Sequence, residues 1–166
     1  MHTAIKIYKG LIEPHFDYCS AVWDGLIQQF SEKLKKLQNR AIRLITKSSY
    51  DTSSGFLLTS LRWDNLSVRR AKQKGNLIYK CINNLAPAYL CNLFAPRTPN
   101  YYFRNAKEKL MLPKPRTDYL KRSFSYSGAL LWNNLPEEIR TSNSLGFFER
   151  GSYRLFSDQY SHTANV

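Results

Sequence analysis

The sequence predicts a mainly α-helical protein, in which a small helical bundle is followed by a loop-rich connector and a smaller helical unit. Apolar residues recur at spacings of three and four along most of the chain, as they do on one face of a helix. Four of the seven prolines lie within 95–118, where that spacing stops. We therefore expect the bundle at 1–94, the connector at 95–118 and the C-terminal unit at 119–160.

The first two helices are expected from Thr3 to Glu13 and at 31–47. Pro14 should end the first, because a residue that precedes proline is pushed out of the helical conformation. Ser31 is the expected N-cap of the second. The buried stripe of this second helix is expected to contain Leu34, Leu37, Ala41, Leu44 and Ile45.

A basic stripe runs along the helix at 31–47. At 100° per residue its cations gather on one side of the helix, roughly 110–130° from the centre of the expected apolar stripe. A helix of this kind is anchored by one face and offers the other to a negatively charged surface. The cations are Lys33, Lys36, Arg40, Arg43 and Lys47.

Two further helices are expected before the connector. A turn at 51–55 precedes a short helix through Leu61, and Asp64 is the expected cap of a helix that runs to about Asn83. Gly75 costs about 1 kcal/mol relative to alanine inside a helix, so it indicates a close helix contact or a local break. The longer helix carries a second group of cations: Arg69, Arg70, Lys72 and Lys74.

The elements expected after residue 83 are shorter. Pro87 suits the first turn of a helix that reaches Phe94, and the connector can hold a short strand near 109–112. Pro136, which precedes two glutamates, begins a helix, and Ser144 caps the last one. The C-terminal unit also begins with two candidate nucleic-acid-binding cations, Lys121 and Arg122.

The chain is strongly basic, with 25 Lys and Arg against 12 Asp and Glu and a formal charge of +13. An excess of this kind favours a polyanionic partner. No apolar run reaches the roughly 18 residues of a membrane span, and the first residues lack the pattern of a signal peptide. Three scattered cysteines do not predict a disulfide framework. We therefore expect an intracellular protein, nuclear or cytoplasmic, that is not secreted and does not contact a membrane.

The residue patterns that carry catalysis are not found. His15 and Cys19 can share a helical face, but two ligands do not make a metal site. The seven glycines are scattered and form no phosphate-binding loop. The aspartates are isolated, and Glu137 with Glu138 fits a helix start better than a two-metal centre. We therefore expect no enzymatic activity, no metal or cofactor and no small-molecule substrate.

Aromatic residues lie beside cations in two places, as they do in proteins that stack nucleic-acid bases. In the connector, Tyr101, Tyr102 and Phe103 precede Arg104, and both base stacking and core packing remain open for the tyrosines. In the C-terminal unit the rings follow Lys121 and Arg122. For these rings we favour burial in the core, because aromatic side chains dominate small cores; they are Phe124, Tyr126 and Trp132.

Five segments carry a family resemblance through their order and spacing. They are IYKGLIEPHFDYCSAVW at 7–23, LKKLQNRAIRLI at 34–45, LRWDNLSVRR at 61–70, YKCINNLAPAYL at 79–90 and SFSYSGALLWNNLP at 123–136. Together they resemble the region that follows the catalytic core in non-LTR (LINE-type, jockey-like) retrotransposon reverse transcriptases. The resemblance extends over almost the whole chain.

The resemblance implies the thumb and post-thumb region of such an enzyme. Family members carry their polymerase aspartates upstream, in a Tyr/Phe-x-Asp-Asp turn of the palm, and this sequence lacks that turn. In the family the thumb is helical and grips the primer–template duplex. The resemblance therefore implies RNA or an RNA–DNA hybrid as partner, and the palm as a neighbour in a full-length form.

Three functions are compatible with these observations. We favour a non-catalytic fragment of an RNA-directed DNA polymerase that contacts the nucleic-acid backbone through basic helices. The first alternative is a protein-interaction module in which Trp23, Trp63 and Trp132 contact a neighbour. The second alternative is a retroelement remnant without a function of its own.

Overall fold

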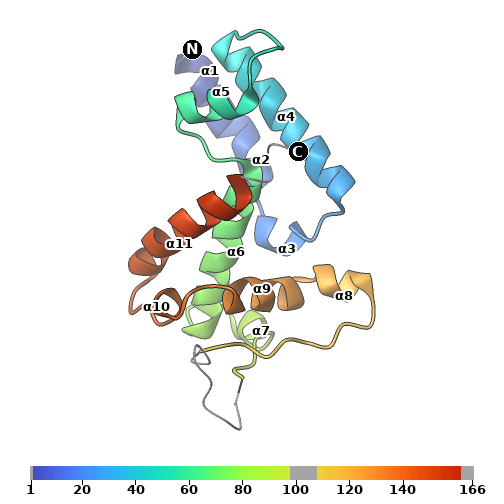
Figure 1. Ribbon diagram of the computed structural model, residues 1–166, viewed down its shortest axis with the longest axis vertical. Coiled ribbons are helices and arrows are strands. Elements are labelled where there is room, and N and C mark those ends of the chain that lie inside the picture. The colour runs from blue at the N-terminus through green and yellow to red at the C-terminus, as the bar shows by residue number, and fades with distance from the viewer. Residues whose placement is uncertain (1, 98–107, 162–166) are drawn as a thin grey trace.

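The computed structural model describes residues 2–97 and 108–161, and the prediction of a mainly α-helical fold is confirmed (Figure 1). In the described ranges, an isolated antiparallel bridge between Pro96 and Leu110 stands where a short strand was expected. The elements are α1 (His2–Ile7), the π-helical segment η1 (Tyr8–Ile12), α2 (Glu13–Asp17), α3 (Ser20–Trp23), α4 (Gln28–Thr46), α5 (Ser54–Leu61), α6 (Leu66–Ile82), α7 (Ala88–Cys91), α8 (Asp118–Arg122), α9 (Phe124–Asn133), α10 (Glu137–Arg140) and α11 (Leu145–Ser161).

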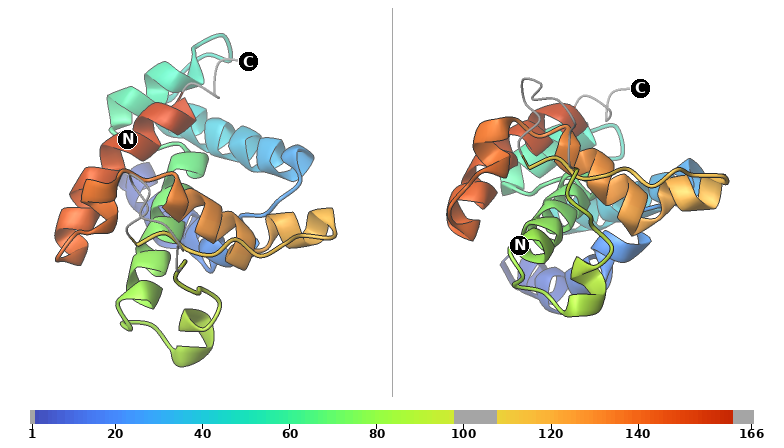
Figure 2. Two further views of the ribbon diagram at one scale, coloured as in Figure 1. Left: turned by 60° about the horizontal axis from the view of Figure 1, so that its bottom comes forward. Right: turned by 90° about the horizontal axis from the view of Figure 1, so that it is seen from below.

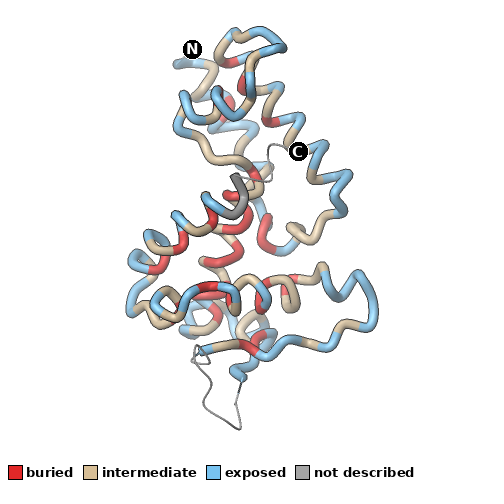
Figure 3. Tube along the Cα trace, in the orientation of Figure 1, coloured by how far each residue is buried: buried red, intermediate tan, exposed pale blue. Residues whose placement is uncertain are grey.

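Helix α6 is the central element of the fold. Helices α11, α9 and α3 all pack against it, and the views of Figure 2 show it between helices from both halves of the chain. The buried residues gather around α6, whereas α4 is largely exposed (Figure 3). The main core contains Ala21, Val68, Ala71, Ile78, Tyr79, Cys81, Phe94, Leu110, Phe124, Ala129, Trp132, Leu135, Phe148 and Phe156.

Gly75 marks a close contact between α6 and α11. A Cβ atom at this position would lie 3.2 Å from the ring of Phe156 and 3.6 Å from that of Phe148. Helix α6 is continuous through Gly75. Of the two outcomes expected from the sequence, the close helix contact is therefore the one observed.

The segments predicted as a bundle at 1–94 and a C-terminal unit at 119–160 share one apolar core. Ile78 and Tyr79 of the first segment lie in the same cluster as Trp132 of the second. A few apolar side chains are buried outside this cluster, all of them in the N-terminal part of the chain. They are Tyr8, Ile42, Ile45, Leu57 and Leu66.

The prediction that Pro14 ends the first helix is wrong. The chain stays helical through η1 and α2 to Asp17, and Pro14 lies in the first turn of α2. At the end of the wider π-helical turn, the Glu13 N–H bonds to the carbonyl of Tyr8. Proline is tolerated in a first turn because its missing N–H leaves no helical bond unmade there.

Helix α4 begins earlier than predicted. Its first residue is Gln28, and Ile27 stands at the N-cap, so Ser31 lies inside the helix. The Ser31 hydroxyl instead accepts a hydrogen bond of 3.1 Å from the Arg70 guanidinium.

The predicted buried stripe of α4 is partly wrong. Leu37 and Leu44 are exposed to 54% and 72%, while the buried residues are Gln38, Ile42 and Ile45. Among the described elements, α5 and α6 are the main contacts of α4, and they meet the side that carries the buried residues. The buried face therefore lies opposite the basic stripe.

The remaining helix starts follow the predictions with small shifts. Asn65, in place of Asp64, caps α6 by accepting a hydrogen bond from Ser67 N–H. Pro87 precedes a helix that ends at Cys91, short of Phe94. The helix starts predicted at Pro136 and Ser144 are observed as α10 and α11.

Candidate nucleic-acid interface

The rotation of α4 is fixed by its buried face. Gln38, almost fully buried, donates to the carbonyl of Asp64 at 3.0 Å and accepts from the Leu66 N–H at 3.3 Å. These two hydrogen bonds tie the middle of α4 to the start of α6. Ile42 and Ile45 follow on the same side, so the cations at 33, 36, 40 and 47 point away from the fold.

The exposed side of α4 carries cations without carboxylate partners. In residues 2–97 and 108–161, no carboxylate lies within ion-pair distance of these cations. An exposed, unpaired cation keeps its charge available for an incoming anion. The four exposed members of the stripe are Lys33, Lys36, Arg40 and Lys47.

Arg43, the fifth predicted cation, is half-buried. Its Nη2 donates to the carbonyl of Thr52 at 3.3 Å, and its guanidinium lies 5.1 Å from the ring centroid of Tyr50. Its Nε is buried and has no hydrogen-bond acceptor in the part of the chain that the structure describes. Arg43 therefore holds the 47–53 turn against α4.

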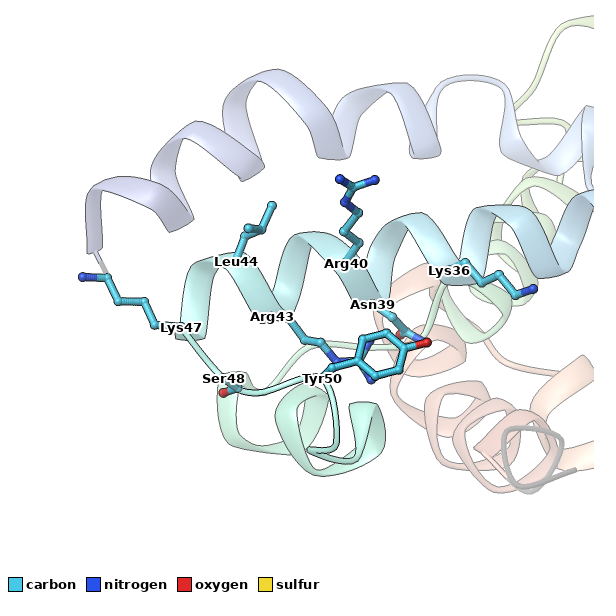
Figure 4. Close-up of a pocket in the computed structure, with 8 residues that line it drawn as sticks. All are labelled: Lys36, Asn39, Arg40, Arg43, Leu44, Lys47, Ser48 and Tyr50. Carbon is cyan, nitrogen blue, oxygen red and sulfur yellow. The ribbon is translucent and has the colours of Figure 1, made fainter.

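A groove of about 890 Å³ opens at the C-terminal end of α4. Figure 4 shows Arg43 against Tyr50, while Arg40 and Leu44 project on the other side of the helix in this view. Sequence reasoning missed Tyr50; the available signal is an aromatic residue in the turn that directly follows a basic helix. The groove is lined by Lys36, Asn39, Arg40, Arg43, Leu44, Lys47, Ser48 and Tyr50.

The end of α4 positions this turn. Lys47 adopts the left-handed conformation with φ 53°, and its N–H bonds to the carbonyl of Arg43. The Ser48 N–H bonds to the same carbonyl at 3.2 Å. This closure of the helix turns the chain back so that Tyr50 reaches α4.

The predicted cations of α6 serve a different purpose, and Arg69 is the first example. Its guanidinium forms ion pairs with both Glu13 and Asp17 of α2. Burial by itself lowers the pKa of Arg69, but the hydrogen bond to Glu13 and the charges of both carboxylates outweigh it and raise the pKa. Arg69 therefore joins α2 to α6.

Arg70 and Lys74 are buried and share one carboxylate. Arg70 Nε donates to Asp24 at 2.8 Å, Lys74 pairs with the other oxygen of Asp24, and the two cations are only 6% and 5% exposed. Trp23 lies 5.9 Å from the Arg70 guanidinium. Neither cation can reach a nucleic acid without leaving this cluster.

Lys72 is also held within the fold. It pairs with Asp64 at 2.6 Å and lies 3.4 Å from the ring centroid of Tyr153 in α11. The α6 cations predicted as a second nucleic-acid surface are thus engaged in contacts between helices. We therefore leave Arg69, Arg70, Lys72 and Lys74 out of the proposed interface.

The two cations of α8 lie near the N-terminal end of α4. Lys121 forms an exposed ion pair of 3.1 Å with Asp118. Arg122 stacks on Tyr119 at 5.0 Å, and these two residues line a shallow pocket together with Phe30 of α4. Arg122 therefore extends the basic side of α4, and Lys121 is partly neutralised.

Two of the three aromatic residues predicted to lie in the core of the C-terminal unit do so. Phe124 and Trp132 are buried in the core, Tyr126 is half-buried, and the Trp132 Nε1 donates to the carbonyl of Glu108 at 2.8 Å. The other predicted stacking residues, Tyr101, Tyr102, Phe103 and Arg104, lie outside the described residues.

Groups that could bind a metal do not gather in the described ranges: no cluster of three His, Cys, Asp or Glu side chains is found there.

Cys81 lies in the core beside Cys91. Burial, followed by the neighbouring Cys91, raises the pKa of the Cys81 thiol to about 11. A thiol with so high a pKa stays protonated at neutral pH and is a poor nucleophile.

No family model, curated protein or solved structure matches this chain. The fold itself defines a mainly α-helical protein built around α6, and the exposed basic helix α4 lies at its side. None of the helices in 2–97 and 108–161 has the length and apolarity needed to cross a bilayer.

Proposed function

We propose that this chain is a non-catalytic nucleic-acid-binding region that contacts backbone phosphates through α4. One observation carries the proposal: among the described residues, Lys33, Lys36, Arg40 and Lys47 along α4 are exposed without carboxylate partners, whereas on α6 only Lys80 is. Unpaired lysines and arginines on one side of a helix are the usual means of holding a phosphate backbone.

The dimensions of α4 suit such a contact. From Lys33 to Lys47 the helix rises about 21 Å, which is long enough to meet several successive phosphates. These contacts position the polymer without reading its sequence. Arg122 prolongs the basic side beyond the first turn of α4.

The family resemblance supports RNA or an RNA–DNA hybrid as the polymer. Under this proposal the chain is the thumb and post-thumb region of a non-LTR retrotransposon reverse transcriptase. The palm would then be its neighbour in a full-length form. The chemistry of polymerisation would belong to that palm, because this sequence contains no Asp-Asp turn.

A salt titration tests the proposal. Affinity for an RNA–DNA hybrid is measured by fluorescence anisotropy at several salt concentrations, with wild type and with Lys36, Arg40 and Lys47 changed together to Gln. Each phosphate contact contributes about 0.9 to the slope of log affinity against log salt on B-DNA. The magnitude of this slope should therefore be smaller by about 2 to 3 in the triple variant than in wild type.

The matched control removes the same charge elsewhere. Arg116, Arg150 and Arg154 are exposed and lie outside α4. Changing these three to Gln should leave the slope within about 1 of wild type. Equal losses in both triple variants would mean that net charge, and not α4, determines binding.

Binding to a protein partner is a second candidate function. It is favoured by exposed apolar side chains in the N-terminal part of the chain. Of the three tryptophans, Trp132 is buried and Trp63 stacks on Tyr8 at 4.6 Å, whereas the half-buried Trp23 lines a shallow pocket with Phe30. The exposed residues include Ile7, Leu11, Tyr18, Val22, Ile27, Phe30, Leu37 and Leu44.

Co-purification after nuclease treatment tests this second candidate. A partner that stays bound to wild type and is lost when Leu37 and Leu44 are changed to Ser would support it. The same two changes should leave the hybrid affinity within about twofold, because uncharged residues add little to phosphate binding.

A further inference from the structure

We propose that the groove at the end of α4 takes an unpaired nucleotide, whose base stacks on Tyr50 while its phosphates lie along the cations of α4. The inference rests on the proposed function and names its substrate class: single-stranded nucleic acid. Proteins that hold single strands combine a basic track with exposed aromatic rings, and each stacked base contributes about 1–3 kcal/mol.

Tyr50 is placed as a stacking platform. Its side chain is 84% exposed, although large aromatic residues are usually buried. Arg43 lies against the ring at 5.1 Å and is itself held by the Thr52 carbonyl. The ring is therefore presented at a fixed place next to α4 while most of its surface stays free.

The groove beside the ring has the groups that a nucleotide needs. Lys36, Arg40 and Lys47 are suited to phosphate, and the side chains of Asn39 and Ser48 can exchange hydrogen bonds with a base or sugar. The volume of about 890 Å³ lies within the range of small-molecule sites, roughly 300–1,000 Å³.

A similar pairing of ring and cation occurs at the opposite end of α4. Phe30 is 48% exposed and lies 5.5 Å from the ammonium of Lys33. Next to Phe30, Tyr119 is 81% exposed and stacks on Arg122. Exposed aromatic rings thus stand at both ends of α4, a helix about 28 Å long.

This combination favours a single strand over a duplex. In a duplex the bases are already stacked and cannot use an exposed ring, whereas phosphates contact cations in either form. A helix evolved only to hold a duplex backbone would gain nothing from exposed rings at its ends. The rings therefore indicate a partner with accessible base faces.

The test compares wild type, Tyr50→Ala and Tyr50→Phe on three probes of one length: an unstructured RNA strand, the same strand made abasic, and its RNA–DNA hybrid. Tyr50→Ala should weaken binding of the intact strand about 5- to 150-fold and binding of the hybrid no more than about twofold. Tyr50→Phe should retain the affinity, because the ring remains. Wild type should bind the abasic strand at least as weakly as Tyr50→Ala binds the intact one, because the abasic strand cannot stack on any of the exposed rings.

Other outcomes separate the two proposals. Equal weakening of strand and hybrid by Tyr50→Ala, or no weakening of either, would overturn the stacking role while salt-dependent binding through α4 stands. Failure of wild type to bind any probe in a salt-dependent manner would overturn both proposals. Because Tyr50 projects into solvent, thermal unfolding of the variants should match wild type, which excludes misfolding as the cause.

Discussion

Helices α4 and α6 contain five basic residues each, yet they use them in opposite ways. On α4, Lys33, Lys36 and Arg40 project from the fold, and none of the five meets a carboxylate among the described residues. On α6, four of the five lie against carboxylates of α2, the loop after α3 and the loop before α6. The number of cations on a helix therefore says little about the charge it presents, because paired cations are neutralised inside the fold.

The largest expected effect comes from removing the carboxylate that two cations of α6 share. Asp24→Asn leaves Arg70 and Lys74 buried without their shared carboxylate, which should destabilise the fold by about 3 kcal/mol. Urea unfolding followed by circular dichroism measures the loss. Asp118→Asn is the matched control, since its pair with Lys121 is exposed and should contribute about 0.5 kcal/mol or less. Equal effects would show that the Asp24 cluster is not buried in solution.

A pH dependence follows from Tyr8, which packs on Trp63 beside the α2–α6 ion pairs. Burial, and then the nearby Glu13 carboxylate, raise the pKa of Tyr8 to about 12 from its ordinary 10.0. The unfolded chain therefore ionises first, and the stabilisation that is present below pH 10 is lost as pH rises toward 12, by about 2 kcal/mol. Urea unfolding at increasing pH measures this loss.

Tyr8→Phe separates this group from the other residues that titrate in alkali. The variant keeps the aromatic ring but has no hydroxyl to ionise. Its stability should therefore fall less than that of wild type between pH 10 and pH 12. Parallel curves for the two proteins would contradict the assignment to Tyr8.

Gly75→Ala tests the packing that keeps α6 at the centre. The added methyl group would lie 3.2 Å from the Phe156 ring, which is fully buried and cannot move aside freely. We expect a loss of about 1 kcal/mol in spite of alanine's better helix propensity. Gly10→Ala is the control, because nothing lies within 4 Å of a Cβ there. A stabilising Gly75→Ala would mean that α11 packs less closely than described.

The smallest expected effect concerns Lys47, at the C-terminal end of α4. Lys47 lies in the left-handed conformation, so Lys47→Gly should stabilise the fold by about 0.5–1 kcal/mol, while Lys47→Ala should not. Both variants remove one charge and should weaken nucleic-acid binding to the same extent. Thermal unfolding and the salt titration together separate the capping role from the charge. Unequal affinities would show that the shape of the turn, more than the charge, governs binding.

Local spacing explains which features the sequence could predict. The helical character of the chain and the exposed side of α4 depend on neighbours within about four residues, and both were predicted, although several helix ends and the exposure of Arg43 were not. The ion pairs of Arg69 and Arg70 join residues 46 to 56 positions apart, such as Arg70 with Asp24, and a pattern on one helix cannot reveal them. The rotation of α4 depends on Gln38 meeting the start of α6, and an amide is not expected at the centre of a buried face.

The position of Tyr50 beside α4 also could not be predicted from the sequence. Its ring reaches α4 only because Lys47 adopts a left-handed conformation and turns the chain back. Glycine is the residue that usually signals such a turn, and this helix lacks it. The groove therefore becomes visible only once the turn after α4 is placed.

Lysine footprinting tests the contrast between α4 and α6 most directly. The protein is acetylated with a limiting amine-reactive reagent, with and without an RNA strand, and the sites are quantified by mass spectrometry. Lys33, Lys36 and Lys47 should react readily in the free protein and become protected when RNA is added. Lys72 and Lys74 should react slowly in both states because their ammonium groups are held in ion pairs. Unchanged reactivity on α4, or protection by RNA confined to α6, would contradict the account.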